Sequence, residues 1–137
     1  MQPIRFRLAL AAALASASPA FSQTPIHVHT GTNGNDYLGY ESATGLGDVD
    51  GDGVPDYAFG APSDASEVGY VRVISGASAE TLVTLLGGGV DVGGSHDQLG
   101  CSIAGIGDVT GDQVPDLLVG VKGDDSAGFN HGAARVY

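Results

Sequence analysis

The sequence is poor in several residue types, and each shortage excludes a class of protein. Of its 137 residues one is Cys, none is Trp and five are Lys or Arg, against 16 Asp or Glu. A single Cys cannot form a disulfide within the chain, and a formal charge of −11 has the wrong sign for binding nucleic acid. No apolar run is long enough for a transmembrane helix. Because 42% of the residues are hydrophobic and 15% are charged, disorder is also disfavoured.

Residues 1–22 have the organisation of a secretory signal peptide. Two arginines precede the apolar run LALAAALA, and Ala20-Phe21-Ser22 then offers small side chains at the third-last and last positions before a cut. We therefore expect an exported protein that is secreted, periplasmic or bound to the cell surface. Its mature chain would carry 3 basic against 16 acidic residues, a formal charge of −13. A short buried helix is the alternative interpretation of this segment.

The chain is rich in Gly, with 23 residues, and much of this Gly belongs to an internal repeat. GLGDVDGDGVPD at 45–56 aligns without a gap with GIGDVTGDQVPD at 105–116, and nine of the twelve positions are identical. A repeat of about 60 residues indicates an array or a propeller. The repeat divides the chain into a first unit at 38–98 and an incomplete second unit at 99–137.

Short strands separated by Gly-rich turns are expected throughout both units. They are predicted at 42–46, 57–61, 70–75 and 82–86 in the first unit, and at 102–106, 117–121 and 133–137 in the second. Four short strands per repeat are typical of a propeller blade. The sequence therefore predicts an all-β fold, a β-propeller of four-stranded blades of which about two are present. We expect the chain to be the N-terminal part of a longer propeller.

Residues 23–37 contain one further predicted strand, at 26–30. It precedes the first unit much as the strand at 82–86 precedes the second, so we hypothesise that it completes the last blade of a longer protein. In such a strand the side chains of His27 and His29 would face solvent. Asp36 and Asp97 each lie two residues before a Leu-Gly pair and are expected to cap the turns between blades.

The acidic residues gather in the repeated loop, where they have the spacing of calcium ligands. The candidate ligands of the first loop are the carboxylates of Asp48, Asp50, Asp52 and Asp56 and the main-chain carbonyl of Val54. Calcium takes roughly six to eight hard oxygen ligands, and alternating residues of a tight loop can direct their oxygens to one centre. Gly53 permits the sharp turn that such a loop requires. The alternative is a solvated acidic turn, although four neighbouring carboxylates repel one another without a cation.

The second loop is a weaker copy of the first. Its candidate ligands are the side chains of Asp108, Thr110, Asp112 and Asp116 and the carbonyl of Val114. Thr110 replaces a carboxylate with a neutral hydroxyl, and Gln113 replaces the Gly of the turn, so weaker calcium binding is expected here. Neither loop is an EF-hand, because Phe59 and Val119 stand where that motif needs a bidentate Glu.

The segment GLGDVDGDGVPDYAFGAP at 45–62 resembles an FG-GAP repeat, the unit of the integrin α-subunit β-propeller and of its bacterial relatives. The second copy, which reads VGVK at 119–122, keeps the Gly of this motif. The resemblance covers roughly residues 24–137. It implies a propeller, usually of seven blades in integrins, with calcium held in the hairpin loop between the first two strands of a blade. The ten residues named above are the ligands that it implies.

These observations predict an exported calcium-binding propeller module that serves in binding or as a scaffold, with calcium in a structural role. Its ligand would be a protein or a carbohydrate, and the chain itself carries no recognisable catalytic motif. One alternative is the propeller part of a secreted enzyme whose catalytic residues lie outside this chain. Another is a two-repeat β-roll or a free-standing small domain, because residues 31–38 nearly fit the calcium-binding β-roll pattern.

Overall fold

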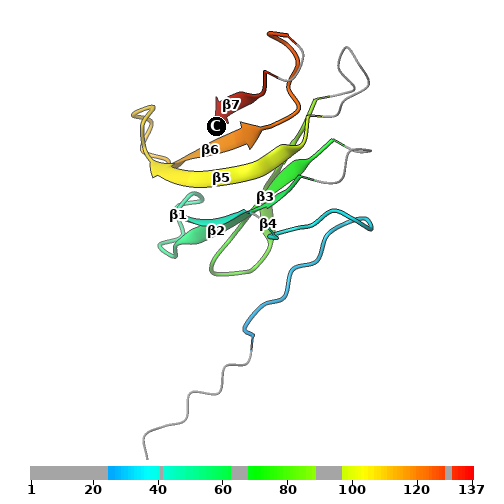
Figure 1. The fold of residues 1–137 in the computed structure, drawn as a ribbon. Coiled ribbons are helices and arrows are strands. Elements are labelled where there is room, and N and C mark those ends of the chain that lie inside the picture. The colour runs from blue at the N-terminus through cyan, green and yellow to red at the C-terminus, as the bar shows by residue number, and fades with distance from the viewer. Residues whose placement is uncertain (1–24, 41, 63–67, 89–96, 129–130) are drawn as a thin grey trace, which may run out of the picture.

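A computed structural model describes residues 25–40, 42–62, 68–88, 97–128 and 131–137. The strands are β1 (Ala43–Gly47), β2 (Asp56–Ala61), β3 (Tyr70–Ile74), β4 (Thr81–Leu86), β5 (Leu99–Gly107), β6 (Asp116–Val121) and β7 (Ala133–Val136). They form a four-stranded sheet in the order β1-β2-β3-β4 and a three-stranded sheet in the order β5-β6-β7 (Figure 1). The described residues contain no helix that could span a membrane. The expected signal peptide lies outside them.

Each sheet is an antiparallel meander, which the alternating sequence pattern explains. In β3 the apolar residues are β-branched or aromatic, and such residues fit a pleated, half-buried surface. The two sheets have matching registers, since Phe59 of β2 lies opposite Arg72 of β3, and Val119 of β6 lies opposite Arg135 of β7. This all-β arrangement fits a fragment of a β-propeller, and the described residues do not form a closed ring.

The two sheets share one hydrophobic core. Its buried members are Leu46, Ala58, Val71, Val73, Leu99, Leu117, Val119 and Val121. They come from both sheets, and β5 lies against β1, β2 and β3 (Figure 1). Burial of apolar area stabilises the structure by about 25 cal/mol per Å². Neither sheet covers its own apolar face, and each sheet buries that face against the other. The apolar contacts between the sheets therefore stabilise each sheet and also hold the two together.

Small residues let the two sheets approach closely at one point. The Ser42 hydroxyl donates a hydrogen bond to the carbonyl of Gly100 at 2.6 Å, which links the chain before β1 to the start of β5. A Cβ atom at Gly60 would collide with that carbonyl and with the Ser42 hydroxyl. Glycine at position 60 is therefore required by this contact between the sheets.

Replacing Gly60 tests this close approach. We expect Gly60→Ala to lower the free energy of unfolding by about 1–3 kcal/mol, the usual cost of overpacking. Gly45→Ala in β1 is the matched control, because nothing lies within 4 Å of a Cβ there and Gly45 has no positive φ. It should be neutral or slightly stabilising. Urea unfolding followed by circular dichroism measures both variants, and equal effects would contradict a close contact at Gly60.

The predicted strand at residues 26–30 is not formed in the structure, and the hypothesis that it completes the last blade of a longer protein stays a prediction. These residues form no strand in the structure, and Ile26 and Val28 are 89% and 74% exposed. An alternating pattern becomes a strand when a second strand pairs with it, and the described residues provide no such partner here. His29 also does not face solvent. It is half-buried, and one ring nitrogen lies 3.0 Å from the Tyr57 hydroxyl.

The other predicted strands are present, with shifts at their ends. β5 is the largest difference, because it begins at Leu99 instead of position 102 and continues to Gly107. A register irregularity between Leu99 and Ser102 lets this longer strand pair with β6. Asp36 caps a turn as predicted, since it accepts the Asn33 amide at 2.7 Å. Asp97 likewise accepts a main-chain amide, that of Gly88 at 2.6 Å, and the residues between them lie outside the described ones.

Candidate metal centre

The first acidic loop connects β1 to β2 and is organised around Asp48. The Asp48 carboxylate accepts hydrogen bonds from the amides of Gly51, Asp52 and Gly53, at 2.7, 3.0 and 2.8 Å. These bonds fold the backbone around the carboxylate. Gly51 and Gly53 have φ values of 80° and 88°, in the left-handed region that glycine adopts at little cost.

Asp56 fixes the other end of the loop. Its side chain is 2% exposed, and its two oxygens accept the amides of Val49 at 2.7 Å and Gly76 at 2.8 Å. Gly76 follows β3, so this carboxylate connects the acidic loop to the next hairpin. A buried carboxylate with bonds to the main chain on both sides has a fixed orientation, which is what a preorganised ligand requires.

Three carboxylates of this loop come together. Oxygen atoms of Asp48, Asp50 and Asp56 all lie within 4.8 Å of one another. Clustered anionic oxygens repel one another in the absence of a cation, and hard divalent ions such as Ca²⁺ prefer this type of ligand. The three side chains therefore fit a divalent cation, with Asp56 buried, Asp48 half-buried and Asp50 exposed.

Two of the five predicted ligands in this loop are not part of the cluster. The Asp52 carboxylate accepts the amide of Val54 at 2.8 Å, so it closes a local turn. Asp52 and the Val54 carbonyl remain predictions as ligands. Asp50 accepts the Asp52 amide in the same way at 3.1 Å, so a bond of this kind does not by itself exclude a carboxylate as a ligand.

The second loop has the same backbone organisation and a different set of side chains. Asp108 accepts the amides of Gly111, Asp112 and Gln113, at 2.6, 3.1 and 3.0 Å. These bonds repeat those of Asp48. Gln113 has a φ of 74°, so a residue with a side chain occupies the left-handed conformation that Gly53 adopts in the first loop.

Thr110 changes the chemistry of the second loop. Asp116 accepts the amides of Val109 at 2.6 Å and Thr110 at 2.9 Å, and the Thr110 hydroxyl lies 3.3 Å from the same carboxylate. Asp112 accepts the Val114 amide at 2.9 Å, as Asp52 accepts that of Val54. Among the residues that the structure describes, this loop does not bring three carboxylates together as the first loop does. Weaker binding at this loop, and any role of its five residues as ligands, remain predictions.

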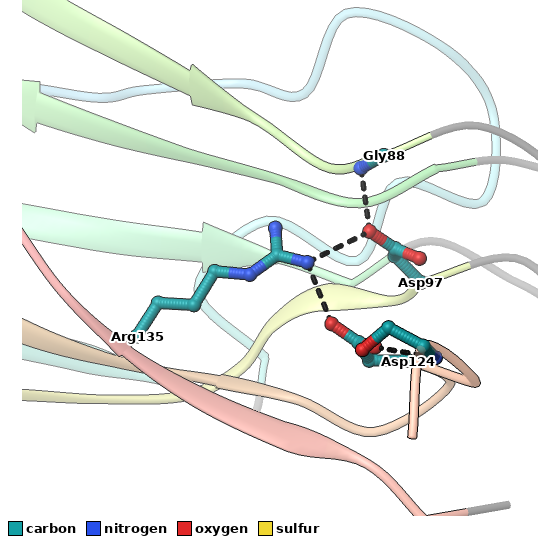
Figure 2. Close-up of polar contacts among 5 residues, drawn as sticks. Gly88, Asp97, Asp124 and Arg135 are labelled. Carbon is teal, nitrogen blue, oxygen red and sulfur yellow. Dashed lines mark hydrogen bonds and ion pairs between the residues drawn. The ribbon is translucent and has the colours of Figure 1, made fainter. Parts of the chain in front are cut away.

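A second polar site, which the sequence did not reveal, lies between the two sheets. The Arg135 guanidinium of β7 pairs with Asp124 at 2.7 Å and with Asp97 at 3.5 Å (Figure 2). Asp97 also accepts the Gly88 amide, and Gly88 follows β4 of the first sheet. The cluster thus ties the end of the first sheet to the second. Arg135 has the same register position in the second sheet as Arg72 in the first, and this equivalence is recognisable only once the strand registers are known.

The first unit has a related cluster around Asp36. Its carboxylate is 3% exposed and accepts the Tyr70 hydroxyl at 2.9 Å. Burial raises the pKa of Asp36, but the bonds from Asn33, Tyr70 and Thr32 and the charge of Arg72 outweigh this effect, so the pKa lies below its ordinary value. Arg72 lies over the Tyr70 ring, 5.0 Å from its centroid. Asp36 is therefore held ionised at the start of the first unit.

Acid should weaken the Asp124 site in a defined pH range. Hydrogen bonds from the Ser126 side chain and amide, together with Arg135, lower the pKa of Asp124 from 3.8 to about 2. A carboxylate whose pKa is lowered in the folded state stabilises the fold at pH values above its pKa in the unfolded state. This contribution is lost as the pH falls toward about 2. The melting-temperature difference between the original protein and Asp124→Asn should therefore shrink between about pH 5 and about pH 2. A constant difference would contradict this role.

Comparison with known proteins gives one partial match. No protein-family model matches the chain. Integrin alpha-7 of Mus musculus is 40% identical over 88 residues, an alignment that covers 61% of this chain. The chain spans 7% of the length of that integrin. This similarity supports an integrin-alpha-like relationship.

Proposed function

We propose that this chain is an exported calcium-binding module of the FG-GAP β-propeller type, which serves in binding or as an extracellular scaffold. The observation that carries the proposal is the cluster of Asp48, Asp50 and Asp56 in the loop between β1 and β2. The FG-GAP resemblance implies calcium in this loop, and the partial similarity to an integrin α-subunit agrees with it.

Calcium in this loop would have a structural role. Asp48 organises the loop backbone and Asp56 joins the loop to Gly76, so an ion shared by these carboxylates would hold both hairpins in place. Magnesium is less suited, because it keeps several water ligands and demands near-ideal octahedral geometry. Weak extracellular calcium sites have dissociation constants of about 10⁻⁴–10⁻³ M, a range that suits an exported protein.

The proposed role is recognition or support, without catalysis. A relative named as an integrin α-subunit weakly favours a binding module over an enzyme. The binding partner would be a protein or a carbohydrate. Calcium binding would explain part of the large negative charge of the chain. Seven of its 16 acidic residues lie in the two loops at 48–56 and 108–116.

Removing one charge from the cluster tests the proposal. Asp50→Asn should weaken calcium binding by about tenfold or more, equal to about 1.4 kcal/mol, because one of three clustered carboxylates becomes neutral. Asp50 is exposed, so the fold should persist. Glu80→Gln is the matched control, since it removes the same charge from an exposed position outside the loops. Isothermal titration measures both, and equal affinities in the two variants would rule out the Asp50 site.

Adding a carboxylate to the second loop should strengthen calcium binding there. Thr110→Asp restores the carboxylate that the first loop has at Asp50, and more charged ligands tighten calcium binding. The titration should then show a second site of higher affinity than in the original protein. An unchanged titration curve would argue against calcium binding at this loop.

A further inference from the structure

Three places in the sequence have an Asn or Asp side chain directly before a glycine. They are Asn33-Gly34, in the turn before the first sheet, and Asp50-Gly51 and Asp52-Gly53, in the first acidic loop. Such pairs share a reaction, in which the main-chain nitrogen of the glycine attacks the side-chain carbonyl carbon of the preceding residue. Glycine favours the attack because it has no Cβ to obstruct the approach. Whether a pair reacts therefore depends on how the fold holds that nitrogen.

The fold holds both glycine nitrogens of the acidic loop. The Gly51 amide donates to the Asp48 carboxylate at 2.7 Å, and the Gly53 amide donates to it at 2.8 Å. The attack requires a nitrogen that has lost its proton, and a hydrogen bond to an anion makes that loss more costly. These bonds also direct each nitrogen toward Asp48. We therefore expect both pairs of the loop to be protected in the folded protein.

The nitrogen of Gly34 is not held in this way. Among the residues that the structure describes, it donates no hydrogen bond. Asn33 and Gly34 are both exposed, and a Cβ atom at Gly34 would meet no atom within 4 Å. The turn thus has room to rearrange for the attack, and water can reach it. The same residue pattern therefore stands in two different environments within this chain.

We propose that Asn33-Gly34 is a site of spontaneous modification, at which Asn33 is converted to isoaspartate and aspartate. The Gly34 nitrogen forms a bond to Cγ of Asn33, and the side-chain nitrogen leaves as ammonia with the proton that Gly34 gives up. Water then opens the cyclic imide. Opening at Cγ gives aspartate, and opening at the main-chain carbonyl carbon gives isoaspartate, in which the backbone runs through the side chain. The net reaction consumes water and releases ammonia, and it does not depend on the metal centre.

Isoaspartate at position 33 disturbs the turn that Asp36 caps. The Asp36 carboxylate accepts the amides of Thr32 and Asn33, and it accepts the Tyr70 hydroxyl at 2.9 Å. The link from residue 33 to residue 34 lies inside the ring that the two amide bonds close, and isoaspartate lengthens this link by a carbon atom. It also adds a negative charge close to a carboxylate that is 3% exposed. The modification therefore loosens the turn and its connection to β3 through Tyr70.

Peptide mapping of the full chain by mass spectrometry, after incubation at mildly alkaline pH, tests the proposal. In the folded protein Asn33 should lose ammonia at nearly the rate found in the same chain unfolded in guanidinium. Both products should form, and they are separated by their retention times. The two Asp-Gly pairs of the acidic loop are the internal controls. They should isomerise in the unfolded chain and remain unchanged in the folded one.

Gly34→Ala is the matched variant. It should slow the loss of ammonia about tenfold or more, because a Cβ hinders the approach of the nitrogen. The fold should persist, since the position is open and has no positive φ. Equal rates in the original protein and in Gly34→Ala would contradict an attack by the Gly34 nitrogen. An Asn33 that reacts in the unfolded chain and stays intact in the folded protein would overturn the proposal.

The melting temperature tests the structural consequence separately. The incubated original protein should melt at a lower temperature than the fresh protein, because the Asp36 turn is loosened. Incubated Gly34→Ala should keep the melting temperature of its fresh form. A fully modified protein that melts like the fresh one would show that the turn tolerates isoaspartate, and would exclude this consequence.

Discussion

Calcium is expected to raise the melting temperature of the full chain by about 10 °C or more over its value in a chelator. A ligand that binds the folded state at a hundredfold excess over its dissociation constant stabilises that state by about 2.7 kcal/mol. For a domain of about 100 residues, each kcal/mol moves the midpoint by roughly 4–8 °C. The chain has no Trp, so circular dichroism is the suitable probe of this transition.

The effect should be specific to the ion and to the loop. Magnesium at the same concentration should give a smaller shift, because its preferred geometry suits an all-protein oxygen site less well. Asp50→Asn should reduce the calcium shift, whereas Glu80→Gln should retain it. Melting temperatures that are the same in calcium and in chelator would contradict a structural role for the ion.

Leu99→Ala is expected to lower the free energy of unfolding by about 2–5 kcal/mol, the usual cost of truncating a fully buried Leu. Leu99 is 0% exposed and belongs to the core that the two sheets share. Its loss leaves a cavity at the point where β5 meets the first sheet. Urea unfolding followed by circular dichroism gives the midpoint and the slope for this comparison.

Leu86→Ala is the matched control for Leu99→Ala. Leu86 ends β4 and is 68% exposed, so the same truncation there should change stability by less than about 0.5 kcal/mol. If the two variants lost the same stability, the sheets would not depend on a common core. A two-step unfolding curve in Leu99→Ala would likewise show that the sheets unfold separately.

Most of the strands could be predicted from the sequence because their pattern is local. Alternating β-branched residues in β3 and the repeated loop between paired strands indicate hairpins without any knowledge of the tertiary structure. Residues 26–30 show the limit of this reasoning, because alternation describes one strand and says nothing of its partner. The early start of β5 at Leu99 depends on contacts with the first sheet, which a local pattern does not contain.

The grouping of acidic side chains in the first loop could be predicted in part, and their role as metal ligands stays a prediction. The spacing identified Asp48, Asp50 and Asp56, whose oxygens the loop brings together. It could not show that Asp52 bonds the Val54 amide, because that choice depends on side-chain orientation. The difference of the second loop could be predicted at Thr110, because a neutral hydroxyl in place of a carboxylate changes the possible ligand set whatever the geometry. Weaker calcium binding there stays a prediction.

The polar site between the sheets could not be predicted, because its parts are distant in the sequence. Asp97 and Arg135 are 38 positions apart and meet through the register of β6 and β7. Asp124 enters the site from the loop after β6, where a local bond to Ser126 fixes its carboxylate. Such sites become recognisable when strand registers are known.

Nuclear magnetic resonance of the full chain during a calcium titration tests the central claim most directly. The amides of Gly51 and Gly53 donate to Asp48, and those of Gly111 and Gln113 donate to Asp108, so each pair reports on one loop. We predict saturable shifts of the first pair at lower calcium concentration than any shift of the second pair. Unchanged amides in the first loop up to about 10 mM calcium, well above the range of weak extracellular sites, would contradict the account.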